Sequence, residues 1–238
     1  FEDTKELPNA LFEQGSIEFR NNQFSQARAR FLRIAQDHRD ATVAPEASLM
    51  IGECFLAETN FEDAEQAYEM TAEVYENSPV RATALYKLGW IDFKNNQFAE
   101  AINTFDRVLQ DYPNHSVAAN ALFWKGEAQY KSEEFASAYR TYQTFIDTYP
   151  QSERLADAYY GLGYSAQELG KFTEASQAFA AASERAGDTT VAVDASLREA
   201  DALFNARAYS RAIKAYEEAL TASNDPSIKA ESQYQIGM

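Results

Sequence analysis

The stretch ATALYKLGWIDFKNNQFAEAINTFDRVLQDYPNHSVA, residues 82–118, decides the fold of this chain. Its apolar residues recur at helical spacing up to Phe93, and they do so again over 98–109. The polar run 95–97 interrupts this pattern, and Pro113 ends it. Such spacing predicts two amphipathic helices that are joined by a short polar turn.

The same pattern recurs every 37 residues along the chain of 238 residues. The recurring positions form two columns of small residues and two of aromatic residues: Gly15, Gly52, Gly89, Gly126, Gly163, Ala200 and Gly237; Ala27, Ala64, Ala101, Ala138, Ala175 and Ala212; Phe24, Phe61, Phe98, Phe135, Phe172 and Tyr209; and Phe31, Tyr68, Phe105, Tyr142, Phe179 and Tyr216. A period in this range predicts a solenoid, in which each repeat packs on its neighbours. We therefore expect an all-α fold, a right-handed superhelical solenoid of antiparallel helix pairs.

We predict one continuous array over residues 1–238. Its repeats are expected at about 8–44, 45–81, 82–118, 119–155, 156–192 and 193–229, with a partial seventh at 230–238. The last helix is expected to begin near Lys229 and to lack a second helix that would cover it. Because the chain starts with Phe1 rather than Met and stops within a helix pattern, we expect it to be a piece of a longer protein.

Local features predict how the helices pack and how they begin. The glycine column on the first helix of each repeat and the alanine column on the second are expected to meet, because close helix contacts need a small side chain. The aromatic columns would fill the flanking space. Ser116 and Ser152 follow Tyr-Pro pairs and are expected to cap the helices after them.

The third repeat resembles the tetratricopeptide repeat in the order of its large, small and aromatic residues, which are Leu85, Leu88, Gly89, Phe93, Phe98, Ala101, Phe105 and Pro113. The resemblance covers nearly the whole chain, although each repeat here is longer than the usual length of about 34 residues. The junctions 109–116 and 146–152 are similar to those of a longer variant in bacterial cell-envelope proteins. Examples are the lipoprotein subunit of the outer-membrane β-barrel assembly machine and the Tol–Pal-associated division coordinator. This resemblance implies a periplasmic or cell-envelope location, with a cytoplasmic location as the alternative.

Composition excludes several classes of partner. The net charge of −16 would repel the phosphates of a nucleic acid, so we expect no nucleic-acid partner. No apolar run reaches about 18 residues, so we expect no membrane span. Cys54 is the one cysteine and cannot form an internal disulfide. It replaces isoleucine of neighbouring repeats and is predicted to be a small core residue.

No group of residues in this sequence has the spacing of a catalytic or metal site. His38 and His115 lie in junctions between repeats and have no repeated partner. The sequence Gly161-Leu162-Gly163 falls within a helix pattern and is therefore not a phosphate-binding loop. We predict that the protein is not an enzyme, with no catalytic residue, no cofactor and no metal.

The resemblance implies that the first helix of each repeat lines a concave groove. We expect repeats three to five to bind a partner through a set of aromatic and basic residues: Tyr86, Lys87, Trp90, Phe93, Lys94, Phe123, Trp124, Tyr130, Lys131, Tyr160 and Tyr164. Aromatic anchors beside a few charges are typical of binding hot spots. The alternative interpretation of each ring is that it packs between neighbouring helices.

These features favour a non-catalytic scaffold that binds a segment of a partner protein or peptide, of unknown identity, in its groove. One alternative is a module that binds a glycan or small ligand on the same aromatic rings. A second is a structural spacer within a larger multi-repeat protein. The uncovered face of the last helix, with Tyr234 and Ile236, also predicts end-to-end self-association.

Overall fold

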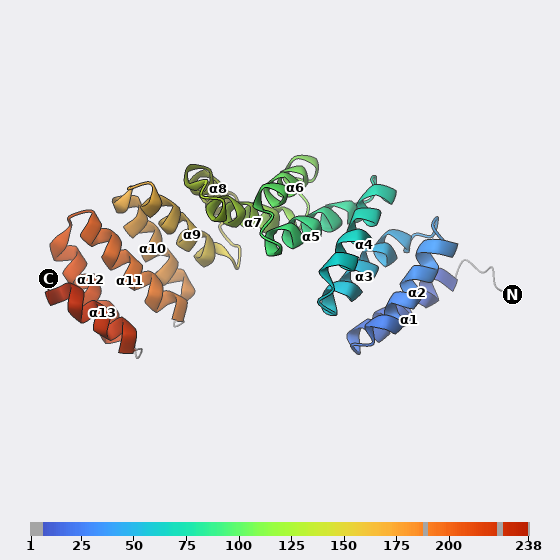
Figure 1. Ribbon diagram of the computed structural model, residues 1–238, viewed down its shortest axis with the longest axis horizontal. Coiled ribbons are helices and arrows are strands. Elements are labelled where there is room, and N and C mark those ends of the chain that lie inside the picture. Colours follow the sequence, from blue (N-terminus) through green and yellow to red (C-terminus); the bar gives the residue numbers. More distant parts are fainter. Residues whose placement is uncertain (1–6, 188–189, 223–225, 238) are drawn as a thin grey trace. The chain divides into compact units, whose positions relative to one another are not determined.

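The computed structural model describes residues 7–187, 190–222 and 226–237, and these residues form helices and turns without any β-strand (Figure 1). The helices are α1 (Leu7–Arg20), α2 (Phe24–Asp37), α3 (Ala44–Ala57), α4 (Phe61–Val74), α5 (Val80–Lys94), α6 (Phe98–Asp111), α7 (Ala118–Lys131), α8 (Phe135–Thr148), α9 (Leu155–Glu168), α10 (Phe172–Ala186), α11 (Thr190–Asn205), α12 (Tyr209–Ala222) and α13 (Pro226–Gly237). The predicted all-α array of helix pairs is confirmed for this part of the chain.

The chain divides into two compact units, Phe1–Ala121 and Leu122–Met238. Within each unit, consecutive helices lie side by side as antiparallel neighbours (Figure 1). The first helices of adjacent repeats also contact one another, as α3 contacts α1 and α5, and as α13 contacts α11. Each unit therefore has a face that its first helices form together.

The second helix of each described repeat begins at the first aromatic column, from Phe24 in α2 to Tyr209 in α12. The turn before it is the same in every repeat and contains one residue in the left-handed conformation: Asn22, Thr59, Asn96, Glu133, Gly170 and Arg207. In the first repeat the N–H of Asn22 donates to the carbonyl of Phe19, and that of Gln23 donates to the carbonyl of Glu18. These two bonds satisfy carbonyls that the end of a helix leaves without a partner.

The glycine column has a different neighbour from the one that we expected. A Cβ built on Gly52 would lie 2.5 Å from Cε1 of Tyr68, and one on Gly126 would lie 2.9 Å from Cε1 of Tyr142. The second aromatic column thus lies directly against the glycines, because only a missing side chain lets a ring approach the helix backbone so closely. The alanine column is fully buried, as expected, but it is not what the glycines face most closely.

One recurring position in the junctions accepts a backbone hydrogen bond just before the next helix. The Ser78 hydroxyl accepts from the N–H of Val80, and the Ser152 hydroxyl accepts from the N–H of Arg154. The equivalent residue in the repeat between them is His115, whose Nδ1 accepts from the N–H of Val117. Ser152 bonds the N-cap residue of α9, Arg154, and is not itself a helix cap, so the cap predicted for it is not formed. In the repeat before it the equivalent bond is made by His115 and not by Ser116.

The last helix, α13, begins at Pro226 rather than near Lys229, because proline suits the first turn of a helix. Its two apolar residues differ in environment. Ile236 packs against the core cluster around Tyr216, whereas the side chain of Tyr234 is 65% exposed. The uncovered face of this helix is therefore narrower than the sequence suggested.

Cys54 is fully buried in the core of the first unit, as predicted. Burial raises the pKa of its thiol to about 12, because an apolar environment disfavours the thiolate. The residue therefore behaves as a small apolar core residue and not as a nucleophile.

Candidate binding surface

The residues of the predicted groove in the first unit lie on α5 and are only partly buried. Tyr86 packs against Phe105 at a ring-centroid distance of 6.2 Å, and Phe93 packs against Phe98 at 5.6 Å. Both of these rings contact the second helix of their own repeat, so part of their area is intramolecular packing.

Trp90 lies on this surface between two lysines, Lys87 and Lys94. The ring of Trp90 lies 6.2 Å from that of Phe61, and Lys94 Nζ lies 5.2 Å from its centroid, within the range of a cation–π contact. Lys94 is exposed, whereas Lys87 is half-buried and bonded to Glu53.

The predicted residues in the second unit lie on α7 and α9. Phe123 is only 5% exposed and packs against Tyr142 and Phe145, so it belongs to the core. Trp124 is half-buried, and the guanidinium of Arg154 lies 5.0 Å from the Phe123 centroid and 5.5 Å from the Trp124 centroid.

Three tyrosines continue this surface from α7 to α9. The rings of Tyr130 and Tyr164 are 6.2 Å apart, and those of Tyr160 and Tyr164 are 4.9 Å apart with their hydroxyls within 3.1 Å. Tyr160 also donates a hydrogen bond to Asp194 on α11. All three rings are half-buried, and Lys131 beside them is exposed. Partner binding by this set of residues stays a prediction.

One recurring pair of residues escaped the sequence analysis. In the second, fourth and sixth repeats a buried tyrosine of the second helix donates its hydroxyl to an acid on the first helix. The pairs are Tyr68 with Glu53 at 2.7 Å, Tyr142 with Glu127 at 2.5 Å, and Tyr216 with Asp201 at 2.6 Å. A buried hydroxyl needs such an acceptor, since an unpaired one loses its bonds to water without compensation.

The first, third and fifth repeats carry phenylalanine where the others carry tyrosine, and they carry no acid at the facing position. The facing residues are Ser16 for Phe31, Trp90 for Phe105 and Tyr164 for Phe179. The sequence alone contained this signal, because tyrosine and acid alternate together in every second repeat. It was missed because the aromatic column was treated as uniform.

Two of the three acids have a cation from the same unit. Lys87 Nζ lies 2.8 Å from Oε1 of Glu53, and Arg198 Nη1 lies 3.0 Å from Oδ2 of Asp201. Glu127 has no ion pair within the described part of residues 122–238. Burial raises the pKa of the Glu127 carboxyl, although the Tyr142 hydroxyl and then the charges of Lys131 and Arg154 oppose this change.

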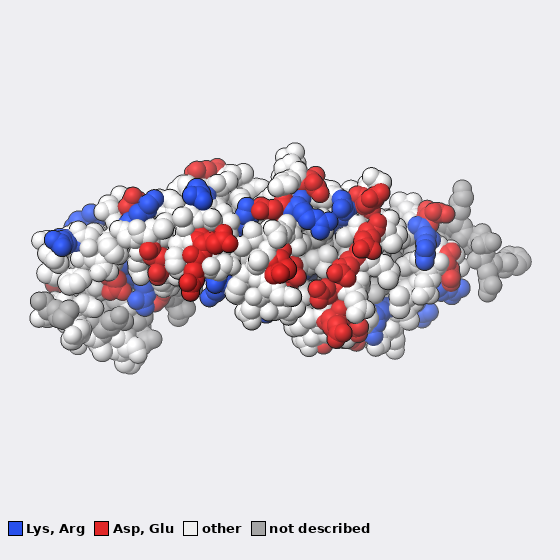
Figure 2. Space-filling model, turned by 45° about the horizontal axis from the view of Figure 1, so that its top comes forward, with Lys and Arg blue, Asp and Glu red and all other residues white. Residues whose placement is uncertain are grey.

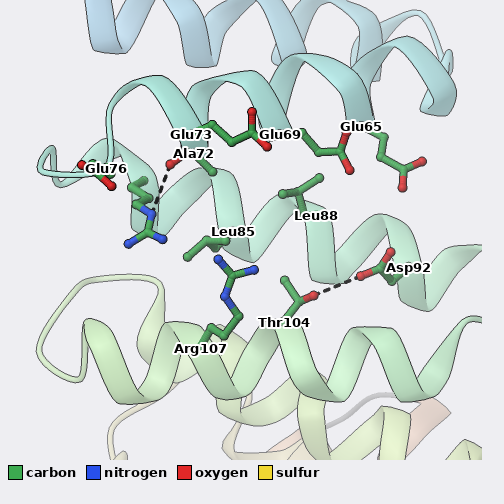
Figure 3. A pocket seen from close by; sticks show the side chains of 11 residues that line it. Glu65, Glu69, Ala72, Glu73, Glu76, Leu85, Leu88, Asp92, Thr104 and Arg107 are labelled. Atoms are coloured by element: carbon green, nitrogen blue, oxygen red, sulfur yellow. Dashed lines mark hydrogen bonds between the residues drawn. The ribbon is translucent and has the colours of Figure 1, made fainter.

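A second feature of the first unit is an acidic cleft between α4 and α6, over α5. It has a volume of about 440 Å³, and Figure 2 shows acidic side chains in a row over α4. Glu65, Glu69 and Glu73 extend from α4, and Leu85 and Leu88 form its apolar floor (Figure 3). The cleft could not be predicted from the sequence, because its lining residues come from α4, α5 and α6 together.

The carboxyl groups of the cleft influence one another. Burial raises the pKa of Asp92 to about 6, although the Thr104 hydroxyl stabilises the carboxylate through a bond of 3.3 Å. Burial, together with Glu69 and Glu62, also raises the pKa of Glu65. Arg107 points into the cleft from α6 (Figure 3) and offsets part of this charge.

Two kinds of feature are absent from the described residues. No cluster of three or more His, Cys, Asp or Glu side chains has the arrangement of a metal site there. Among the same residues, no helix has the length and apolar character that crossing a bilayer demands. The face of the first helices in each unit and the acidic cleft of the first unit are candidate binding surfaces.

This architecture, helix pairs of fixed length with a glycine against an aromatic ring, is that of a tetratricopeptide repeat protein. A tetratricopeptide repeat model matches residues 45–114. The model of the family YfiO, described as outer membrane lipoprotein, matches residues 80–205, which is more than half of the chain. The chain therefore belongs to this family. No curated protein matches it.

Solved structures of other repeat proteins share the fold. A tetratricopeptide repeat protein from Parabacteroides merdae has a TM-score of 0.68 at 15% identity, over 97% of this chain and 88% of that one. PilW, described as a widely conserved type IV pilus biogenesis factor, has a TM-score of 0.67 at 17% identity, over 94% and 98%. MamA from Desulfovibrio magneticus RS-1 has a TM-score of 0.63 at 18% identity, over 75% and 94%.

Proposed function

We propose that this protein is a non-catalytic scaffold that holds a segment of a partner protein against its first helices. The observation that carries this proposal is the set of half-buried aromatic rings that each unit has on its own first helices, on α5 in the first unit and on α7 and α9 in the second, with basic groups beside them. Large rings that keep one edge exposed are the usual anchors of protein interfaces. The tetratricopeptide repeat family, whose members commonly act in protein interactions, supports the same function.

The rings favour a protein segment over a glycan. A sugar ring stacks on a flat aromatic face that is open to solvent, whereas basic groups already lie over Trp90 and Trp124. The tyrosines of the second unit pack edge to face, at 85° between Tyr160 and Tyr164. Such a surface offers edges, hydroxyl groups and charges, which suit the mixed side chains of a peptide.

We place this activity in an assembly of the bacterial cell envelope. The description of the family as outer membrane lipoprotein supports this location. Fusion of the natural full-length protein to a reporter that is active only outside the cytoplasm tests it. Activity of the reporter is the expected result, and activity of a matched cytoplasmic reporter instead would contradict the location.

The binding function is tested by selecting linear peptides on the chain and measuring their affinity for Trp90→Ala and Trp124→Ala. Truncation of an interface anchor typically costs about 2–4 kcal/mol of binding free energy. We expect at least one of the two variants to lose such an amount with little change in thermal stability. Tyr209→Ala, which removes an exposed ring from α12, is the matched control and should bind as the unmodified chain does.

Unchanged affinity in both tryptophan variants would show that the rings lie outside the binding surface, and unfolding of both would show that they are core residues. In that case the proposal fails. Binding of peptidoglycan fragments that the tryptophan variants abolish, without any peptide binding, would instead favour the glycan module.

A further inference from the structure

The three buried tyrosine–acid pairs differ in what neutralises the acid. In the second repeat, the cation is Lys87, which stands 34 positions after Glu53. In the sixth repeat it is Arg198, which stands three positions before Asp201. Each of these carboxylates thus has a hydrogen bond from a tyrosine and an ion pair within its own unit.

The fourth repeat has neither cation. The position 34 residues after Glu127 is Gly161, and the position three residues before it is Trp124. Gly161 has no side chain to reach the acid, and the Tyr142 ring lies against it: a Cβ there would be 2.4 Å from Cζ of that ring. The half-buried carboxylate of Glu127 therefore keeps its tyrosine bond but lacks the ion pair that its two counterparts have.

The surroundings of Glu127 suit a cation that comes from outside the chain. Tyr130 stands three residues after it, and residues at this spacing lie on the same side of a helix. The ring of Trp124, three residues before it, already has the guanidinium of Arg154 over it. Aromatic rings attract a cation through their negative faces, and a carboxylate gives it a charge-assisted hydrogen bond. The charges of Lys131 and Arg154 act on the acid and favour its ionised form, whereas the charge of Asp157 opposes it.

We propose that Glu127, with Tyr130 beside it, forms a subsite for a lysine or arginine side chain of the bound partner segment. This inference rests on the proposed function, because it names the chemistry of the partner at one point of the face of the first helices. The partner's cation takes the place that Lys87 and Arg198 fill for the other two acids. The net charge of −16 of the chain favours the approach of such a basic segment.

Peptide selection against the whole chain tests the inference. A display library of random linear peptides is selected on the unmodified protein, and the affinity of each selected peptide is then measured for Glu127→Gln. The glutamine keeps an oxygen that accepts from Tyr142 but removes the charge. We expect lysine or arginine at one fixed position of the selected peptides, and about a tenfold or larger loss of affinity in the variant.

Matched variants distinguish binding of a cation at Glu127 from a general effect of the protein's negative charge. Asp201→Asn and Glu53→Gln remove the same charge from pairs that already have a cation, so neither should weaken the peptides by more than about threefold. Replacing the basic residue of the peptide by norleucine should weaken binding to the unmodified protein and change binding to Glu127→Gln little. Equal losses in all three protein variants would show a non-specific charge effect and overturn the subsite.

Further outcomes distinguish the subsite from the proposed function. Peptides that bind through Trp90 or Trp124, without a fixed basic residue or with equal affinity for Glu127→Gln, would overturn the subsite and leave the scaffold function intact. Failure to select any peptide would overturn both. Thermal unfolding of Glu127→Gln close to that of the unmodified chain is the folding control, since the Tyr142 bond is kept.

Discussion

The second, fourth and sixth repeats differ from the first, third and fifth at two positions that both affect stability. The former have a buried tyrosine bonded to an acid, and the latter have phenylalanine with no acid. In the left-handed turn position the former have Thr59, Glu133 and Arg207, whereas the latter have Asn22, Asn96 and Gly170. Asparagine and glycine adopt this conformation far more readily than the other three residues.

The same backbone therefore accommodates two different choices of residue at each of these positions. The glycine, the alanine and the aromatic ring are shared by nearly all repeats, because they set the distance between the two helices of a pair. The hydroxyl and its acid are optional, provided that both are present or both absent. We infer that the shared positions determine the fold and that the alternating ones determine where a half-buried charge lies on the face of the first helices.

The largest effect is expected from breaking a shared position. Gly126→Leu places a side chain where a Cβ alone would lie 2.9 Å from the Tyr142 ring, so the free energy of unfolding should fall by about 3 kcal/mol or more. Chemical denaturation measures this loss. The sixth repeat provides the control, because it already has the buried Ala200 against Tyr216, and Ala200→Gly should cost only about 1 kcal/mol. Similar effects of the two changes would refute the close contact.

A double-mutant cycle sharpens the difference between the two classes of repeat. Glu53→Ala leaves the fully buried Tyr68 hydroxyl without its acceptor, which should cost about 1–3 kcal/mol of stability. In a Tyr68→Phe background the same change should cost much less, and the coupling energy measures the pair. Any loss from the stranded Lys87 is common to both backgrounds and cancels. Additive effects would mean that the alternation has no energetic basis.

Most of the fold could be predicted from the sequence, because the repeat length fixes which residues are equivalent. The start of every described second helix falls on one predicted column. The neighbour of the glycines was predicted wrongly, since spacing along a chain does not give the depth to which a ring enters between two helices. The predicted start of the last helix, near Lys229, was also wrong, because Pro226 forms the first turn of that helix.

The candidate site was predictable only in part. The sequence could place Trp90 and Trp124 on first helices, but it could not show that Phe123 is buried by two rings of α8. The acidic cleft was missed because it needs residues from α4, α5 and α6 at once. The charge of Glu127 could be evaluated only when its counterparts, Glu53 and Asp201, were seen with their cations.

A smaller effect is expected at a hydrogen-bonded pair of side chains that contains a carboxyl group in the third repeat and a neutral amide in the fourth. Asp92 accepts a hydrogen bond from Thr104, and the equivalent residues of the next repeat are Gln129 and Thr141, bonded at 2.6 Å. Burial raises the pKa of Asp92 from 3.8 to about 6. The folded protein therefore holds the proton of Asp92 more tightly than the unfolded chain does. The stability that this difference contributes is complete below pH 3.8 and is lost as the pH rises through about 6.

Asp92→Asn gives this pair the neutral form that the next repeat has. At about pH 7 the variant should be more stable by about 1 kcal/mol, a figure reduced for solvent screening because the carboxyl is half exposed. The gain should vanish as the pH falls below the raised pKa. Denaturation at several pH values measures it, with the exposed Asp37→Asn as the control. A gain that does not depend on pH would show that the charge of Asp92 is not its cause.

The smallest effect is expected at the turn position that alternates between the two classes of repeat. Glu133 has a φ of 61°, close to the 60° of Asn96 and the 70° of Gly170. In this conformation the Cβ of glutamate lies too close to the following carbonyl oxygen, which disfavours it. Glu133→Gly and Thr59→Asn should each raise the free energy of unfolding by about 0.5–1 kcal/mol, because they relieve this strain. Asn96→Gly exchanges two residues that both tolerate the turn. It should change the free energy of unfolding by no more than about 0.3 kcal/mol. If the three variants unfold at the same denaturant concentration as the unmodified chain, the left-handed turns store no strain, and the choice of residue there is neutral in all repeats.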